Sequence, residues 1–115
     1  MKIAIAVDQS QAANHFGHCQ FFVVYEVDNC EIKDESIIEN PPHKKDFLPG
    51  FLKEKGINLV ITGNIGQRAI NLLEGFDIEV ITGATGSSKD IIQKFLNDEL
   101  VSTNSGCTEH ENHSC

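Results

Sequence analysis

A short motif occurs twice in the second half of the chain, and its repetition limits the folds that the sequence can adopt. Val60–Gly66 and Val80–Gly86 both read Val-Ile-Thr-Gly-x-x-Gly, at a spacing of twenty positions. Each copy is followed by a segment whose apolar residues recur at helical spacing. Two consecutive strand–turn–helix units build parallel strands that are covered by helices. We therefore predict an α/β domain.

The first half of the chain supplies the other expected strands. Residues 2–7 are apolar on both faces, which is typical of a strand buried between two layers, and we place this strand at the centre of the sheet. Two strand-like runs at 21–27 and 31–38 are separated by an Asp-Asn pair, which favours a tight antiparallel hairpin. A helix is expected after them, capped by Asp46 and ending at Gly56.

The expected order of elements gives a mixed sheet of about five strands with helices on its faces. The last helix has Ser87 and Asp90 at the spacing of a capping box. Ligands of such sheets bind beyond the carboxyl ends of the strands. Residues 8–19, 62–68 and 82–87 are expected to meet at that edge.

Composition and charge exclude several classes of protein. The 115 residues, 40% of them hydrophobic, suffice for one domain, which we place at residues 1–100. A net charge of −8, with only nine scattered Lys and Arg residues, argues against a nucleic-acid partner. No apolar run has the length of a signal peptide or a membrane span, so we expect a cytoplasmic protein without a membrane partner.

The two glycine turns are the first candidate site. Glycines let backbone N–H groups approach a ligand, and each following helix begins with a partial positive charge, so the pair of turns favours an anion. An arginine in the first helical turn adds a charged donor. In the alternative interpretation the glycines only make tight turns between strand and helix. The candidate anion-binding residues are Gly63, Asn64, Gly66, Arg68, Gly83 and Gly86.

One short loop places two imidazoles and a thiol close together. His15, His18 and Cys19 suit zinc, copper or iron, and we assign them as candidate metal ligands. Phe16 is expected to be an apolar anchor under the loop, and Gly17 permits the bend. In a second interpretation Cys19 is a buried small residue and His18 is solvated. A Cys-His acyl-transfer pair is a third, but sequence neighbours rarely supply the geometry that catalysis needs, so no catalytic residue is assigned.

Residues 101–115 form an acidic tail that we expect to be flexible. It contains Cys107, His110, His113 and Cys115, four side chains that could close a tetrahedral zinc site. The alternative is a disordered tail with incidental metal affinity.

The cysteines favour metal binding over disulfides. Cys19, Cys107 and Cys115 have histidine neighbours, and in a reducing cytosol such cysteines are metal ligands or ordinary small hydrophobic residues more often than disulfide partners. Cys30 and His43 lack such neighbours and are expected to be ordinary surface residues.

In order and spacing, these motifs resemble the dinitrogenase iron-molybdenum cofactor biosynthesis family over about residues 1–100. The similarity rests on Met1–Asp8, His15-Phe16-Gly17, Phe21–Tyr25, Thr62–Ala69 and Phe76–Gly86. The resemblance implies a ribonuclease H-like fold and the binding of a cluster at the loop edge. The site that it implies comprises His15, Gly17, Gly63, Gly66, Arg68 and Gly86. Nuclease activity is not implied, because no set of acidic residues would place two catalytic metal ions.

These observations predict a carrier rather than an enzyme. The cargo would be an anionic metal cluster: the iron-molybdenum cofactor, its precursor or an iron-sulfur cluster. Two alternatives stay open, namely a regulatory module for a small anion and a zinc or copper metallochaperone that uses the tail. The expected partners are the cluster and cluster-assembly proteins, with the chain a monomer or a weak homodimer.

Overall fold

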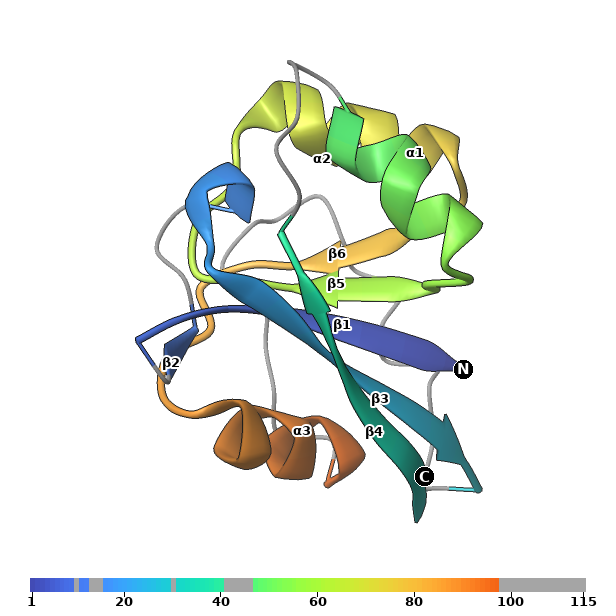
Figure 1. The fold of residues 1–115 in the computed structure, drawn as a ribbon, viewed down its shortest axis with the longest axis vertical. Helices are drawn as coiled ribbons and strands as arrows, with labels where there is room; N and C mark the ends of the chain where they lie inside the picture. The colour runs from blue at the N-terminus through green and yellow to red at the C-terminus, as the bar shows by residue number, and fades with distance from the viewer. Residues whose placement is uncertain (10, 13–15, 30, 41–46, 98–115) are drawn as a thin grey trace.

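The computed structural model describes residues 1–9, 11–12, 16–29, 31–40 and 47–97, without the side chain of His18. In this part of the chain a mixed sheet lies between helices (Figure 1). The elements are β1 (Lys2–Asp8), β2 (Gln11–Ala12), the 3-10 turn η1 (Phe16–His18), β3 (Phe21–Asp28), β4 (Glu31–Glu39), α1 (Phe47–Glu54), β5 (Leu59–Ile61), α2 (Gln67–Gly75), β6 (Glu79–Ile81) and α3 (Ser88–Leu96).

The main strands of the described chain lie in the order β4-β3-β1-β5-β6, and the short β2 pairs with the end of β1. The central β1 runs antiparallel to β3 on one side and parallel to β5 on the other. β4 is antiparallel to β3, and β6 is parallel to β5. The predicted α/β class, the central first strand and the antiparallel hairpin are therefore confirmed.

Alternate residues of β1 face two separate hydrophobic layers. Ala4 and Ala6 are buried on the side of α1 and α2. Ile3, Ile5 and Val7 are buried on the opposite side, against α3. Figure 1 shows α1 and α2 together above the sheet and α3 below it. A strand covered on both faces has no polar side, which explains its continuous apolar pattern.

The helix ends follow local signals in the sequence. The Ser87 side chain accepts a hydrogen bond from the backbone N–H of Asp90 at 3.2 Å, which confirms the predicted cap of α3. Gly56, with φ +82°, follows α1 and adopts the left-handed conformation that glycine favours after a helix. None of the helices in the described ranges is long and apolar enough to span a membrane.

Two local elements were not expected from the sequence, namely β2 and η1. Both lie in the connection between β1 and β3, which reads as a polar loop. Other predictions fall outside the described residues: the cap Asp46, the surface residues Cys30 and His43, and the flexible tail 101–115.

Candidate functional site

Three connections meet at the carboxyl edge of the parallel strands. β1, β5 and β6 run in the same direction, so the segments that follow them emerge side by side (Figure 1). Backbone hydrogen bonds then join these segments directly. They run from Phe16 N–H to Asn64 O (3.0 Å), from Ala12 N–H to Gly86 O (2.9 Å) and from Gly83 N–H to Gly63 O (2.7 Å). The predicted meeting of the three segments at one edge is confirmed.

The threonine of each motif belongs to the framework of this edge. Thr62 and Thr82 are buried, at 0% and 6% exposure. The backbone N–H of Thr62 donates to Ile81 O at 3.0 Å, and its carbonyl accepts from Ala84 N–H at 3.2 Å. The Thr62 hydroxyl lies 3.4 Å from Asn64 O, to which it donates. Thr62 therefore extends the pairing of β5 and β6 into the glycine turns.

The structure makes the two glycine turns unequal. α3 begins with the Ser87 side-chain cap and has Asp90 in its first turn, so its first N–H groups are partly satisfied and a carboxylate lies close by. α2 begins after Gly66 with no side-chain cap and no acidic residue in its first turn. The exposed Arg68 lies in that turn. The first turn of α3 also has a cation, Lys89, so what favours an anion at α2 is the absence of a side-chain cap and of a carboxylate.

The glycines also differ in backbone conformation, and only some of these conformations require glycine. Gly83 and Gly86 have φ of +80° and +97°, a conformation that strains other residues. Gly66 has an extended backbone, with φ −71°. A Cβ atom built on Gly66 or on Gly17 would meet nothing within 4 Å. A Cβ atom on Gly86 would also meet nothing within 4 Å, so Gly66 differs from it in backbone conformation and not in open space.

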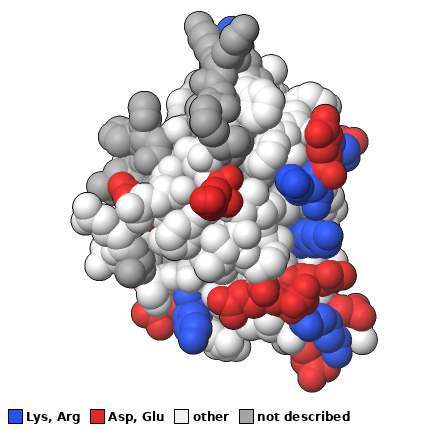
Figure 2. Space-filling view, viewed as in Figure 1, with Lys and Arg blue, Asp and Glu red and all other residues white. Residues whose placement is uncertain are grey.

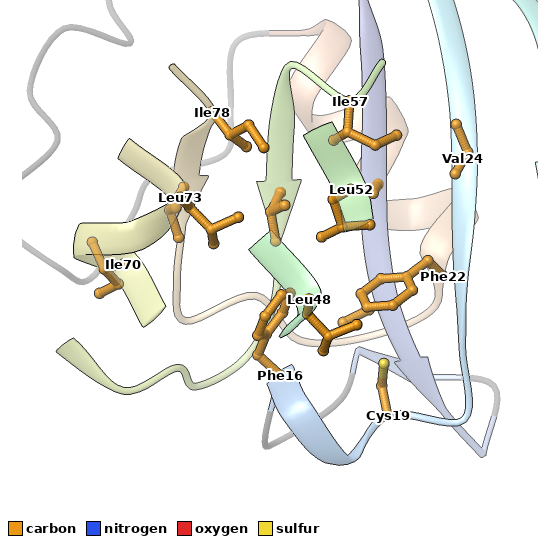
Figure 3. Packing of buried hydrophobic residues seen from close by; sticks show 14 residues of the cluster. Phe16, Cys19, Phe22, Val24, Leu48, Leu52, Ile57, Ile70, Leu73 and Ile78 are labelled. Carbon is orange, nitrogen blue, oxygen red and sulfur yellow. The ribbon is translucent and has the colours of Figure 1, made fainter. Parts of the chain in front are cut away.

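The loop that carries η1 is anchored by an aromatic ring. Phe16 is 4% exposed, and its ring centroid lies 5.7 Å from that of Phe22. Figure 3 shows both rings among the apolar side chains between α1 and the sheet, near Leu48. The prediction of Phe16 as an apolar anchor is confirmed. Its neighbour Gly17 is half-buried in the same loop.

Cys19 lies at the base of this loop and belongs to the core. It is 4% exposed, and Figure 3 shows its sulfur atom directed into the cluster with Phe22. Burial raises the pKa of the Cys19 thiol to about 11. Backbone hydrogen bonds at Cys19 and Val7 lower this pKa, and the nearby charge of Asp8 raises it more weakly than burial does. In this conformation the sulfur is protonated at neutral pH. Metal ligation by Cys19 stays a prediction that requires proton loss and access to the sulfur.

The residues of this edge fall within a part of the chain that matches a known family. Residues 1–98 match the family described as dinitrogenase iron-molybdenum cofactor. The chain belongs to this family. The family resemblance predicted from the motifs is therefore confirmed.

Relatives of the chain share most of its length. An uncharacterized protein of Methanocaldococcus jannaschii is 33% identical over 105 residues, which cover 87% of this chain and 89% of that protein. The crystal structure of a protein named PH0822 has a TM-score of 0.84 and 28% identity, covering 97% of this chain and 99% of the other. The apo form of the orange protein from Desulfovibrio gigas has a TM-score of 0.74, covering 88% and 91%; at 18% identity this shows a shared fold alone.

The other metal ligands predicted for this dinitrogenase iron-molybdenum cofactor family member stay predictions. Within the ranges that the structure describes, no three His, Cys, Asp or Glu side chains are grouped to hold a metal ion. His15 and the side chain of His18 lie outside those ranges. So do the four tail ligands Cys107, His110, His113 and Cys115, which also follow the matched residues 1–98.

Sequence reasoning missed one residue that contacts the loop that carries η1 directly. Asn40 lies just after β4, and its side-chain amide donates hydrogen bonds to the carbonyls of Gly17 and Cys19. In the sequence it precedes two prolines and reads only as a strand terminator. No local pattern could connect it to residues more than twenty positions earlier.

Proposed function

We propose that this protein is a non-catalytic carrier that binds an anionic metal cluster at the carboxyl edge of β1, β5 and β6. The cargo is the iron-molybdenum cofactor, its precursor or an iron-sulfur cluster. Membership of the dinitrogenase iron-molybdenum cofactor family supports a role connected with that cofactor. The observation that carries the proposal is the open space beside Gly66, at the uncapped start of α2 and next to Arg68.

An anion at this position would be held by local dipoles and not by the overall charge. The chain has a net charge of −8, which repels an anionic cargo. The first N–H groups of a helix have no partner within the helix and carry a partial positive charge. Figure 2 shows the largest group of acidic side chains over the β3–β4 hairpin, away from the loop edge. The largest acidic group seen in this view therefore lies away from the proposed binding edge, at which Asp8 ends β1.

Direct ligands to the cluster would come from the adjacent loop. We propose His15 and His18 as the imidazole ligands, because imidazole and thiolate groups suit iron and other transition metals. Cys19 would join them only after the loop exposes its sulfur. Zinc binding by the tail is a separate proposal that this edge does not require.

We also infer that the domain has a ribonuclease H-like fold. The support is its strand arrangement, in which β4, β3 and β1 are antiparallel neighbours while β5 and β6 run parallel to β1. No nucleic-acid function follows from this fold class, because fold alone does not determine activity.

Filling the space beside Gly66 tests the proposed site. Gly66→Leu is expected to weaken binding of isolated iron-molybdenum cofactor by roughly tenfold or more, because the side chain enters the space where the anion approaches the helix. The free energy of unfolding should change by about 1 kcal/mol or less, since the backbone at Gly66 accepts any residue. Binding is measured by anaerobic titration and stability by chemical denaturation.

Gly75→Leu is the matched control. Gly75 lies at the other end of α2, and a Cβ atom there also meets nothing within 4 Å. This control should bind the cofactor as the wild type does. Equal affinity of Gly66→Leu and wild type would remove the start of α2 from the site.

A further inference from the structure

Asn40 ties the end of the β3–β4 hairpin to the loop that carries η1. Its Nδ2 atom donates to Cys19 O at 2.8 Å and to Gly17 O at 3.3 Å. Its backbone N–H donates to Gln20 O at 3.2 Å. One residue therefore makes three hydrogen bonds to carbonyls of a single short stretch.

The chemistry of these contacts fixes the orientation of the Asn40 amide. Both side-chain partners are carbonyl oxygens, which only the NH2 group can satisfy. The Oδ1 atom is buried, and it has no donor among the described residues. A buried acceptor without a partner is unfavourable. The Asn40 amide group thus donates to two loop carbonyls, while its own oxygen stays without a donor among the described residues.

The opposite side of the loop is attached to the framework of the candidate site. Phe16 N–H donates to Asn64 O at 3.0 Å, in the glycine turn before α2. Gln20 N–H donates to Val7 O at 2.9 Å, at the end of β1. The loop is therefore held between the glycine turn on one side and Asn40 on the other.

We propose that Asn40 is a positioning residue of the cluster site. It acts by holding the Gly17 and Cys19 carbonyls, which fixes how the loop faces the start of α2. This inference rests on the proposed function, because the loop is taken to contact the cluster. A site on a loop needs such support, since a small displacement of its groups weakens binding.

Asn40→Asp is the sharpest test, because a carboxylate would face two carbonyl oxygens and donate to neither. The backbone amide resonances of residues 17–20 should shift in NMR spectra of the ligand-free protein. Affinity for isolated iron-molybdenum cofactor, titrated anaerobically where the variant is fully folded, should fall by tenfold or more. Asn40→Ala, which removes the donors without adding charge, should reduce affinity less.

Asn58→Ala controls for a general loss of stability. Asn58 Oδ1 accepts a hydrogen bond from Lys2 N–H at 2.7 Å, at the opposite edge of the sheet. This variant also loses a side-chain bond to the backbone, but it should keep wild-type affinity. Equal falls in affinity for the Asn40 and Asn58 variants would show a purely structural role and overturn the inference.

The remaining outcomes separate this inference from the proposed function. Wild-type affinity in Asn40→Asp, with cofactor bound by the wild type, would overturn the positioning role alone. A wild-type protein that binds neither the iron-molybdenum cofactor nor its precursor nor an iron-sulfur cluster would overturn the proposed function together with the inference.

Discussion

Replacing Phe16 with Ala is expected to lower the free energy of unfolding by about 3–5 kcal/mol. The ring is 4% exposed and packs against Phe22 in the cluster shown in Figure 3, so its removal leaves a cavity. For a domain of this size the change corresponds to a fall in melting temperature on the order of 15–30 °C. The same variant should weaken cofactor binding, because the loop loses its anchor. Thermal and chemical denaturation measure the loss of stability.

Phe76→Ala provides the comparison. Phe76 is 39% exposed at the end of α2, far from the loop, and its truncation should cost about 1 kcal/mol or less. If the two variants were equally stable, the loop would not be anchored by Phe16, and its position beside the glycine turn would need another explanation.

Alkylation of Cys19 in the native protein is expected to be slower than in the unfolded chain by a factor on the order of 100 at pH 8. Burial raises the pKa of this thiol to about 11, so little reactive thiolate is present, and the sulfur lies within the core. The measurement uses a variant in which Cys30, Cys107 and Cys115 are replaced by Ser. Mass spectrometry follows iodoacetamide labelling with and without denaturant.

The raised pKa also determines how the labelling rate of Cys19 changes with pH. The native labelling rate should keep increasing up to about pH 11, whereas the rate for the unfolded chain should level off near its ordinary pKa of about 9. Labelling of the folded protein at the rate of a free thiol would contradict the burial of Cys19. It would also remove the main obstacle to ligation by this residue.

The sequence predicted the framework because the decisive signals are local. The repeated Val-Ile-Thr-Gly motif predicted β5 and β6 together with α2 and α3, and the two-sided apolar run predicted the central β1. Ser87, three positions before Asp90, marked the start of α3 because its side chain can cap the helix there. Each prediction depends on residues a few positions apart.

Other features depend on contacts that span the chain. The carbonyls that Asn40 holds are twenty-one and twenty-three positions away in sequence. The glycine turns look equivalent in sequence, yet their caps and backbone angles differ in the fold. Cys19 had three interpretations, and only its packing in the cluster with Phe16 and Phe22 showed that the side chain is buried.

Cluster uptake by the wild-type chain tests the proposed carrier function most directly. Protein purified anaerobically is incubated with isolated iron-molybdenum cofactor, passed through a gel-filtration column and analysed for iron, molybdenum and acid-labile sulfide. We expect that all three elute with the protein, in the proportions of the intact cofactor, and that Gly66→Leu retains much less. Elution of the wild type without iron and sulfide would contradict a carrier of the intact iron-molybdenum cofactor, and equal retention by Gly66→Leu would contradict binding at the start of α2.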